Sequence, residues 1–413
     1  MHLEANAFEG MDSLTFLKFH TFHYGIESKK IQLPYGGLDS LPDGLRWLHW
    51  DGYPSKSLPA KFYPQHLFHL IIRGSPIKKC WEGFDQPKLV NPAVLDLSNC
   101  PNLTAIPDLS CSLKLEELHL PGCKRLVEVP SHVQYLDRLI TLDLSNCVNL
   151  KSLPSKLNSK VLKHVRINNY PKVKHCPDIN SEELMELNLD ATPVRELPSA
   201  VYNVKEGGSL RLFGENITDF PAISTSLREF HLSHNAMKEM TSSEVLPKFG
   251  SLKLGDNSQL KSLPNNLWDM VMSKLHIRGS PLLESLPDIS EPVKGLSRIR
   301  ISNCGSLKSL PSSINNLVSL QELDLGNTGI ESLPSSIQEL GLLEWIYLNN
   351  CKSLQSIPIN IHKLPKLVSL ILKGCGSILS LPELPSSLFE LDVGGCKSLQ
   401  ALPSNTVWLM NRK

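Results

Sequence analysis

The sequence has no continuous apolar run of membrane-spanning length, and its first residues lack the pattern expected of a secretory leader. A membrane helix needs about 20 consecutive apolar residues, and a leader needs a basic segment followed by an apolar core. Net charge is also nearly absent, since 42 Lys and Arg residues face 41 Asp and Glu residues. No bulk field therefore draws the chain to nucleic acid or to an anionic membrane. We expect a cytoplasmic or nuclear protein that recognises its partners through local surface features.

Motifs for catalysis and nucleotide binding are missing as well. The sequence contains no H-E-x-x-H, no G-x-S-x-G and no phosphate loop of the form G-x-x-x-x-G-K-[ST]. The 14 histidines are scattered, and four that fall on outward strand positions (His49, His119, His231 and His276) are interpreted as solvated surface residues. We therefore predict no catalytic residue, no cofactor site and no metal site, and we do not expect an enzyme.

What the chain does have is a repeated unit, seen most clearly as LITLDLSNCVNLKSLP from Leu139 to Pro154. Strand side chains alternate between two faces, so Leu142 and Leu144 point inward while Asp143 points outward. Pro154 cannot continue the strand ladder. The unit therefore predicts one short half-buried strand followed by an irregular or helical return.

The same spacing of apolar residues recurs along almost the whole chain. Copies start at positions 14, 45, 67, 92, 115, 139, 162, 184, 207, 227, 249, 272, 296, 320, 343, 367 and 388. After the first copy the interval is 20 to 25 residues, which is the spacing of leucine-rich repeats. The predicted fold is an α/β repeat solenoid of about 17 repeats, a leucine-rich-repeat horseshoe with a parallel β-sheet on its concave face. The repeats between Lys160 and Phe249 are the least regular, and Pro-Ser pairs at 311–312 and 334–335 predict brief helical turns.

Ten cysteines are present, and seven of them occupy the same position, eight residues after the repeat start: Cys100, Cys123, Cys147, Cys304, Cys351, Cys375 and Cys396. Metal sites typically need closer pairs, and equivalent positions on stacked strands are poorly aimed for disulfides. We expect these cysteines to be structural.

Three successive segments near the start resemble a known family. HWDGYPSKSLP (His49–Pro59), the repeat that ends in KKCWEG, and LDLSNCPNLTAIPDLS from Leu95 resemble the opening of the leucine-rich-repeat region of plant Toll/interleukin-receptor-type nucleotide-binding immune receptors. This resemblance implies a module that senses pathogen effectors or guarded host proteins and restrains a nucleotide-binding switch. Because the phosphate loop is missing, nucleotide binding is not carried over to this chain.

The organisation expected from these observations is simple. Residues 1–13 are predicted to be a helical flank left from a preceding domain, residues 14–403 a solenoid and residues 404–413 a tail. The expected function is protein–protein recognition within an immune receptor, in a fragment that lacks the Toll/interleukin-receptor-like and nucleotide-binding domains. The expected partner is a pathogen effector, a guarded host protein or a receptor nucleotide-binding domain. The alternative is a free-standing leucine-rich-repeat adaptor or inhibitor protein.

Outward strand positions are the candidate binding residues, because solenoids bind through their concave surface. Asp96, Glu117 and Asp143 form an acidic zone. The predicted partner-binding set is basic and aromatic: Lys253, Lys274, His276, Arg278, Arg298, Arg300, Trp345 and Tyr347. Glu322 and Asp324 lie on the repeat between the arginines and the aromatics, so internal pairing remains an alternative explanation of this charge pattern.

Overall fold

The chain contains two compact units, and each is described by itself. The first comprises Met1–Val204 with Gly214–Asn216, and the second comprises Lys205–Phe213 with Ile217–Lys413. The division falls among the repeats that are least regular in sequence. A computed structural model describes residues 2–20, 31–82, 87–221, 223, 227–240 and 248–404.

In the first unit, short parallel strands stack one per repeat. The main sheet consists of β1 (Phe16–Phe19), β2 (Trp47–Trp50), β3 (His69–Ile71), β4 (Val94–Asp96), β5 (Glu117–His119), β6 (Thr141–Asp143), β8 (His164–Arg166) and β10 (Glu186–Asn188). Each strand pairs in parallel with the strand of the next repeat. A second, two-stranded sheet joins β7 (Lys156–Leu157) to β9 (Asp178–Ile179), and two 3₁₀ turns, η1 (Ser131–Tyr135) and η2 (Ser199–Val201), lie in the return segments.

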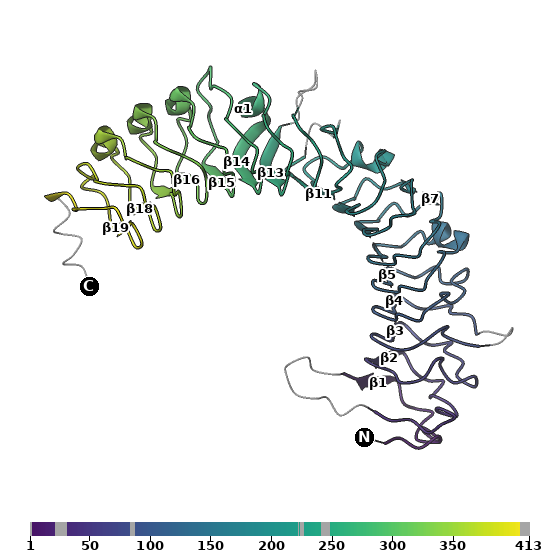
Figure 1. Ribbon diagram of the computed structural model, residues 1–413. Helices are drawn as coiled ribbons and strands as arrows, with labels where there is room; N and C mark the ends of the chain where they lie inside the picture. The colour runs from purple at the N-terminus through teal and green to yellow at the C-terminus, as the bar shows by residue number, and fades with distance from the viewer. Residues whose placement is uncertain are drawn as a thin grey trace. The chain divides into compact units, whose positions relative to one another are not determined.

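The second unit repeats this arrangement. Its sheet consists of β11 (Ser209–Phe213), β12 (Glu229–Ser233), β13 (Phe249–Gly255), β14 (Val271–Arg278), β15 (Arg298–Ser302), β16 (Glu322–Asp324), β17 (Trp345–Tyr347), β18 (Ser369–Ile371) and β19 (Glu390–Asp392). The helical elements are α1 (Leu267–Met270), η3 (Ser312–Asn316), η4 (Ser335–Glu339) and η5 (Ile359–Lys363). Within this unit, the helical turns lie on the side of the coil opposite the strands (Figure 1).

The predicted repeat register is confirmed, because every predicted start has its strand at the expected place. Leu142 and Leu144 are buried, whereas Asp143 between them is partly exposed. In the second unit Leu323 and Leu325 are fully buried in the same way. The alternation of a strand therefore places one leucine row in the core and leaves the other face of each sheet open to partners.

A left-handed residue ends each strand segment and turns the chain back. It lies seven residues after the repeat start, in every repeat from that of Leu45 onward except the one that starts at Gly207. Glycine and asparagine adopt this conformation most easily. They occupy most of these positions: Gly52, Gly74, Asn99, Gly122, Asn146, Asn169, Gly279, Asn303, Asn327, Asn350, Gly374 and Gly395.

The cysteine position directly follows the left-handed residue and is structural, as predicted. The Sγ of Cys147 donates to the Leu120 carbonyl oxygen at 3.1 Å, and that of Cys351 donates to the Leu325 carbonyl oxygen at 3.1 Å. Cys100, Cys123, Cys375 and Cys396 make the equivalent bond to the preceding repeat. All ten cysteines are free thiols. The thiol therefore adds a hydrogen bond between successive repeats, at a carbonyl group that in several repeats also accepts a bond from its own turn, as Leu120 does from the Cys123 N–H.

The return segments and the chain ends differ in part from expectation. The helical turns after Pro311 and Pro334 are present as 3₁₀ turns, and the proline itself is the N-cap residue, without a side-chain cap. The helical flank expected at residues 1–13 has no helix over the described residues 2–13: turns span residues 5–10 and 12–13, His2 bridges to Gln32, and Phe8 is buried. Residues 405–413 of the predicted tail lie outside the described residues. Across the described ranges, no helix is long and apolar enough to cross a membrane.

Candidate partner-binding surface

All eight predicted binding residues lie on four strands of the second unit, β13, β14, β15 and β17. The strand register brings them into rows along the open face of the sheet. One row runs Lys253, His276, Arg300, Asp324, Tyr347, and the adjacent row runs Lys274, Arg298, Glu322, Trp345. Arg278 lies in a third row beside Ser302. Because neighbouring strands are about 4.8 Å apart, successive side chains in a row lie within contact distance.

The two arginines converge on one carboxylate. Arg300 Nε donates to Glu322 Oε1 at 2.6 Å, and Arg298 Nε lies 3.4 Å from Glu322 Oε2. The Glu322 side chain is only 9% exposed, whereas those of Arg298 and Arg300 are 45% and 47% exposed. Internal pairing, the alternative left open by the sequence, is therefore present at these two arginines. Within the described part of the chain, however, their terminal guanidinium nitrogens make no hydrogen bond.

A hollow of about 420 Å³ opens beside this pairing. It is lined by Arg298, Arg300, Glu322, Asp324, Trp345, Tyr347 and Asn349. Four of these seven residues are in the predicted set. Asn349 was missed, although it occupies an outward position six residues after its repeat start, which is the signal that could have identified it. The hollow thus combines two cationic side chains, two carboxylates, an amide and two aromatic rings.

Local burial and neighbouring charges set the protonation states around the hollow. Burial raises the pKa of Asp324 above its usual value, although the Gly326 N–H donates to its Oδ1 at 3.0 Å and opposes this shift. The hydrogen bond to Glu322 raises the pKa of Arg300 further. Burial, followed by the positive charges of Arg300 and Lys253, lowers the pKa of His276. His276 therefore contributes a neutral imidazole to the surface at neutral pH.

The remaining basic residues differ in their contacts. Lys253 Nζ lies 3.9 Å from Glu229 Oε2, a long ion pair between exposed groups. Among the described residues, neither Lys274 nor Arg278 takes part in an ion pair. An exposed ion pair of this kind stabilises the fold by less than about 1 kcal/mol. The Lys253 ammonium group is therefore held only weakly, and positive charge remains available to a partner over β13 and β14.

The three residues of the acidic zone in the first unit each have a partner on a neighbouring or the same strand segment. Asp96 Oδ2 lies 2.6 Å from Arg73 Nη2, and Asp143 Oδ2 lies 3.6 Å from Arg166 Nη1. Glu117 Oε2 lies 2.9 Å from His119 Nε2, so His119 is partnered rather than simply solvated. Beside this zone, Phe16, Trp47 and His69 form a ring stack that the sequence reasoning did not single out.

The repeat length, the parallel strand stack and the open strand face together define a leucine-rich-repeat protein. A family model described as Leucine Rich Repeat matches residues 319–340. The chain is homologous to the leucine-rich-repeat region of plant Toll/interleukin-receptor-type nucleotide-binding disease resistance proteins. It is 34% identical to the disease resistance protein RPS6 of Arabidopsis thaliana over 311 residues, which cover 68% of this chain and 27% of RPS6.

A second relative, the Arabidopsis thaliana disease resistance protein RRS1, is 29% identical over 294 residues, covering 71% of this chain and 19% of RRS1. The chain therefore spans about a quarter or less of the length of these relatives. Among solved structures, a leucine-rich-repeat protein of Leptospira interrogans is 21% identical with a TM-score of 0.43, over 81% of this chain and 91% of that one. The Arabidopsis receptor kinase HAESA is 18% identical with a TM-score of 0.42, over 98% of this chain and 76% of that one.

Proposed function

We propose that this chain is the protein-recognition module of a plant intracellular immune receptor, acting in the cytoplasm or nucleus and without catalysis of its own. The observation that carries this proposal is the 34% identity to a disease resistance protein over 68% of the chain. In this role the module senses a pathogen effector or a guarded host protein, or contacts the receptor's nucleotide-binding domain. The nucleotide chemistry belongs to other parts of such a receptor.

The partner surface in this proposal is the predicted set on β13, β14, β15 and β17. Glu322 is a positioning residue, because its buried carboxylate holds Arg298 and Arg300 through their Nε atoms. A guanidinium group held in this way can offer its terminal nitrogens to a partner carboxylate at a lower entropic cost. Trp345 and Tyr347 are partly exposed beside it, and aromatic residues and arginine are enriched at binding hot spots. A partner segment fits this arrangement if its carboxylates face the two arginines and an adjacent apolar side chain packs against Trp345 and Tyr347.

The test begins with co-precipitation from plant tissue, followed by affinity measurements with the purified partner. The double variant Trp345→Ala/Lys274→Glu removes an aromatic anchor and reverses an unpaired charge. It leaves the Arg300–Glu322 pair intact. We expect at least a tenfold loss of affinity with little change in the unfolding midpoint.

The matched control is Tyr135→Ala/Lys308→Glu. Tyr135→Ala removes an exposed aromatic ring from a 3₁₀ turn, and Lys308→Glu reverses an exposed charge. Neither residue belongs to the predicted partner-binding set. This control should bind as the parent chain does. Equal affinity of both variants for a folded partner would show that recognition uses another surface. Separately, transcripts that encode a phosphate loop in frame upstream would support the receptor assignment, and a complete transcript without one would favour the adaptor.

A further inference from the structure

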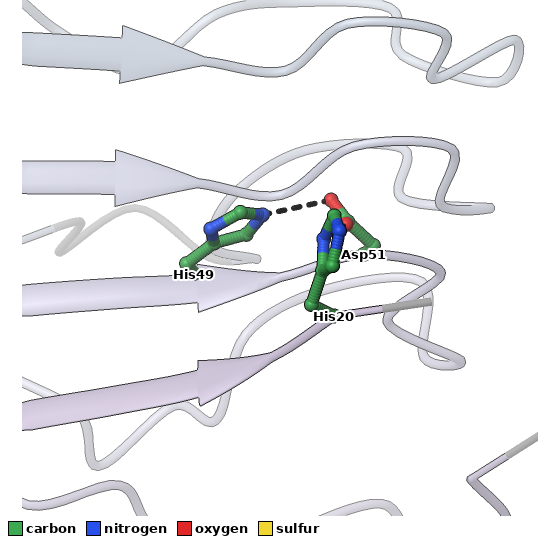
Figure 2. Close-up of side chains that lie close together, drawn as sticks. All are labelled: His20, His49 and Asp51. Atoms are coloured by element: carbon green, nitrogen blue, oxygen red, sulfur yellow. Dashed lines mark hydrogen bonds and ion pairs between the residues drawn. The ribbon is translucent and has the colours of Figure 1, made fainter. Parts of the chain in front are cut away.

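Three potential metal ligands meet on the first two repeats of the first unit: His20, His49 and Asp51. His20 Nδ1 lies 2.6 Å from Asp51 Oδ2, and His49 Nε2 lies 3.0 Å from Asp51 Oδ1. The three ligand atoms all lie within 4.8 Å of one another. Figure 2 shows both imidazole rings turned toward the single carboxylate. The two rings also contact each other edge to face, with centroids 5.6 Å apart.

The backbone holds these three residues in place. His49 belongs to β2, Asp51 directly follows β2, and His20 directly follows β1. The Asp51 N–H donates to the Phe19 carbonyl oxygen at 2.9 Å, so the residue before His20 is tied to the residue that supplies the carboxylate. Ligands fixed on strand ends keep their geometry better than ligands on free loops.

Two of the three potential ligand side chains are mostly buried, and the third is partly exposed to solvent. The side chains of His49 and Asp51 are 9% and 13% exposed, whereas that of His20 is 39% exposed. The interpretation of His49 as a solvated surface histidine is therefore wrong. Two ligands are shielded from water, and the third is partly exposed, so solvent can supply an ion and a fourth ligand from its side. Lys18, in register with His49, is exposed, so its ammonium group can turn toward solvent.

We propose that His20, His49 and Asp51 bind a divalent zinc ion that joins the first repeat to the second. Imidazole nitrogen and carboxylate oxygen are zinc ligands at about 2.0–2.2 Å, and three protein ligands with a water molecule complete a tetrahedron. Such ligand atoms lie about 3.3 Å apart by tetrahedral geometry, so shifts of about an ångström or less admit the ion. Each neutral imidazole must carry its proton on the nitrogen that faces away from the metal.

The test uses the full chain, first freed of metal with a chelator and then titrated with zinc chloride in competition with a chromophoric chelator. We expect one equivalent of zinc to bind, and the variants His20→Gln and Asp51→Asn to lose at least tenfold in affinity for it. His119→Gln is the matched control, because His119 faces Glu117 in a pair that no third ligand joins among the described residues. This control should retain the zinc affinity of the parent chain. Zinc should also raise the unfolding temperature of the parent and of His119→Gln but not that of His20→Gln.

Cobalt supplies a readout that does not depend on whether a variant folds. The visible absorption of cobalt bound to the parent chain should indicate a tetrahedral site with nitrogen and oxygen ligands. An intense sulfur-to-metal charge-transfer band would place the metal on cysteines and overturn the proposal. Absence of stoichiometric zinc binding, or equal binding by the parent, His20→Gln and Asp51→Asn, would also overturn it and leave a hydrogen-bonded trio.

Discussion

Glu322 shows how one side chain shapes the candidate surface. The side chain is 9% exposed, lies on β16 between the arginines and the aromatics, and contacts both Arg298 and Arg300. Removing one partner of such a buried carboxylate leaves a charge that is poorly solvated. The arginines therefore have two roles, since they stabilise Glu322 internally and present their remaining donors on the open face. For this reason our binding test changes Lys274 and leaves Arg300 unchanged.

Two histidines on the same face should make stability depend on pH. Burial, with the charges of Lys253 and Arg211, lowers the pKa of His231 to about 4, and burial also lowers the pKa of His276. At high pH both imidazoles are neutral in the folded and in the unfolded chain, so the free energy of unfolding does not depend on their titration there. Below the unfolded value of about 6.5 the unfolded chain binds protons that the folded chain does not bind. Folding is therefore destabilised progressively as the pH falls from about 6.5 toward 4.

The double variant His231→Gln/His276→Gln should reduce this loss of stability. After allowance for partial exposure, we expect it to retain about 1 kcal/mol more of its neutral-pH stability at pH 4.5 than the parent does. Urea unfolding at pH 7.5 and 4.5 measures the difference. His66→Gln, at an exposed position, is the control and should behave as the parent. Identical pH profiles for the parent and the double variant would refute this interpretation.

Among the elements of each repeat, the turn that follows the strand is the most constrained. Its left-handed residue reverses the chain, and in several repeats the next residue donates to a carbonyl group of the preceding repeat, as Cys351 does for Leu325. Six cysteines make this bond. Thr328 occupies the same position and donates to the Leu325 carbonyl oxygen of its own repeat at 2.7 Å. Tyr170 also occupies this position and donates to the Leu144 carbonyl oxygen of the preceding repeat, so the shared feature is a side-chain donor rather than thiol chemistry or small size.

Asn327 provides a test of the left-handed turn. Its φ is 56° and the residue is exposed, so its side chain contributes little packing. Asn327→Ala should cost about 1 kcal/mol because a Cβ without a local polar partner is disfavoured in this conformation. Asn327→Gly should change stability by less, roughly 0.5 kcal/mol, because glycine adopts the conformation without steric cost but gains freedom when unfolded. Urea unfolding of both variants measures this order, and a more stable alanine variant would contradict it.

On the scale of the whole molecule, stability comes from contacts between adjacent repeats. Each leucine row is buried against the rows of the repeats before and after it, and Leu323 has no exposed surface. In such a stack each repeat contacts only its neighbours, so a substitution in one repeat destabilises that repeat and its immediate neighbours most. Local packing within each unit thus replaces the single central core of a globular domain.

Leu323→Ala should show this locality. We expect a loss of about 2–5 kcal/mol on chemical unfolding, because the truncation leaves a cavity in a fully buried position. Hydrogen exchange should accelerate most in β15, β16 and β17 and progressively less toward β11 and β19. Val318→Ala, at a site 41% exposed in the same unit, is the control and should have little effect. A stability loss below about 1 kcal/mol, or uniform acceleration throughout the second unit, would argue against nearest-neighbour packing.

The amino-acid sequence by itself determined the repeat register, because strand periodicity and the leucine spacing act within a single repeat. It therefore places Leu323 inside, Arg300 outside and Cys351 at the turn. Only the tertiary structure decided which outward side chains meet, because those contacts join residues of different repeats. The hydrogen bond of Arg300 to Glu322 spans 22 residues, and that of His20 to Asp51 spans 31. Such pairs depend on how the stacked strands align and how side chains turn, which no periodicity within one repeat specifies.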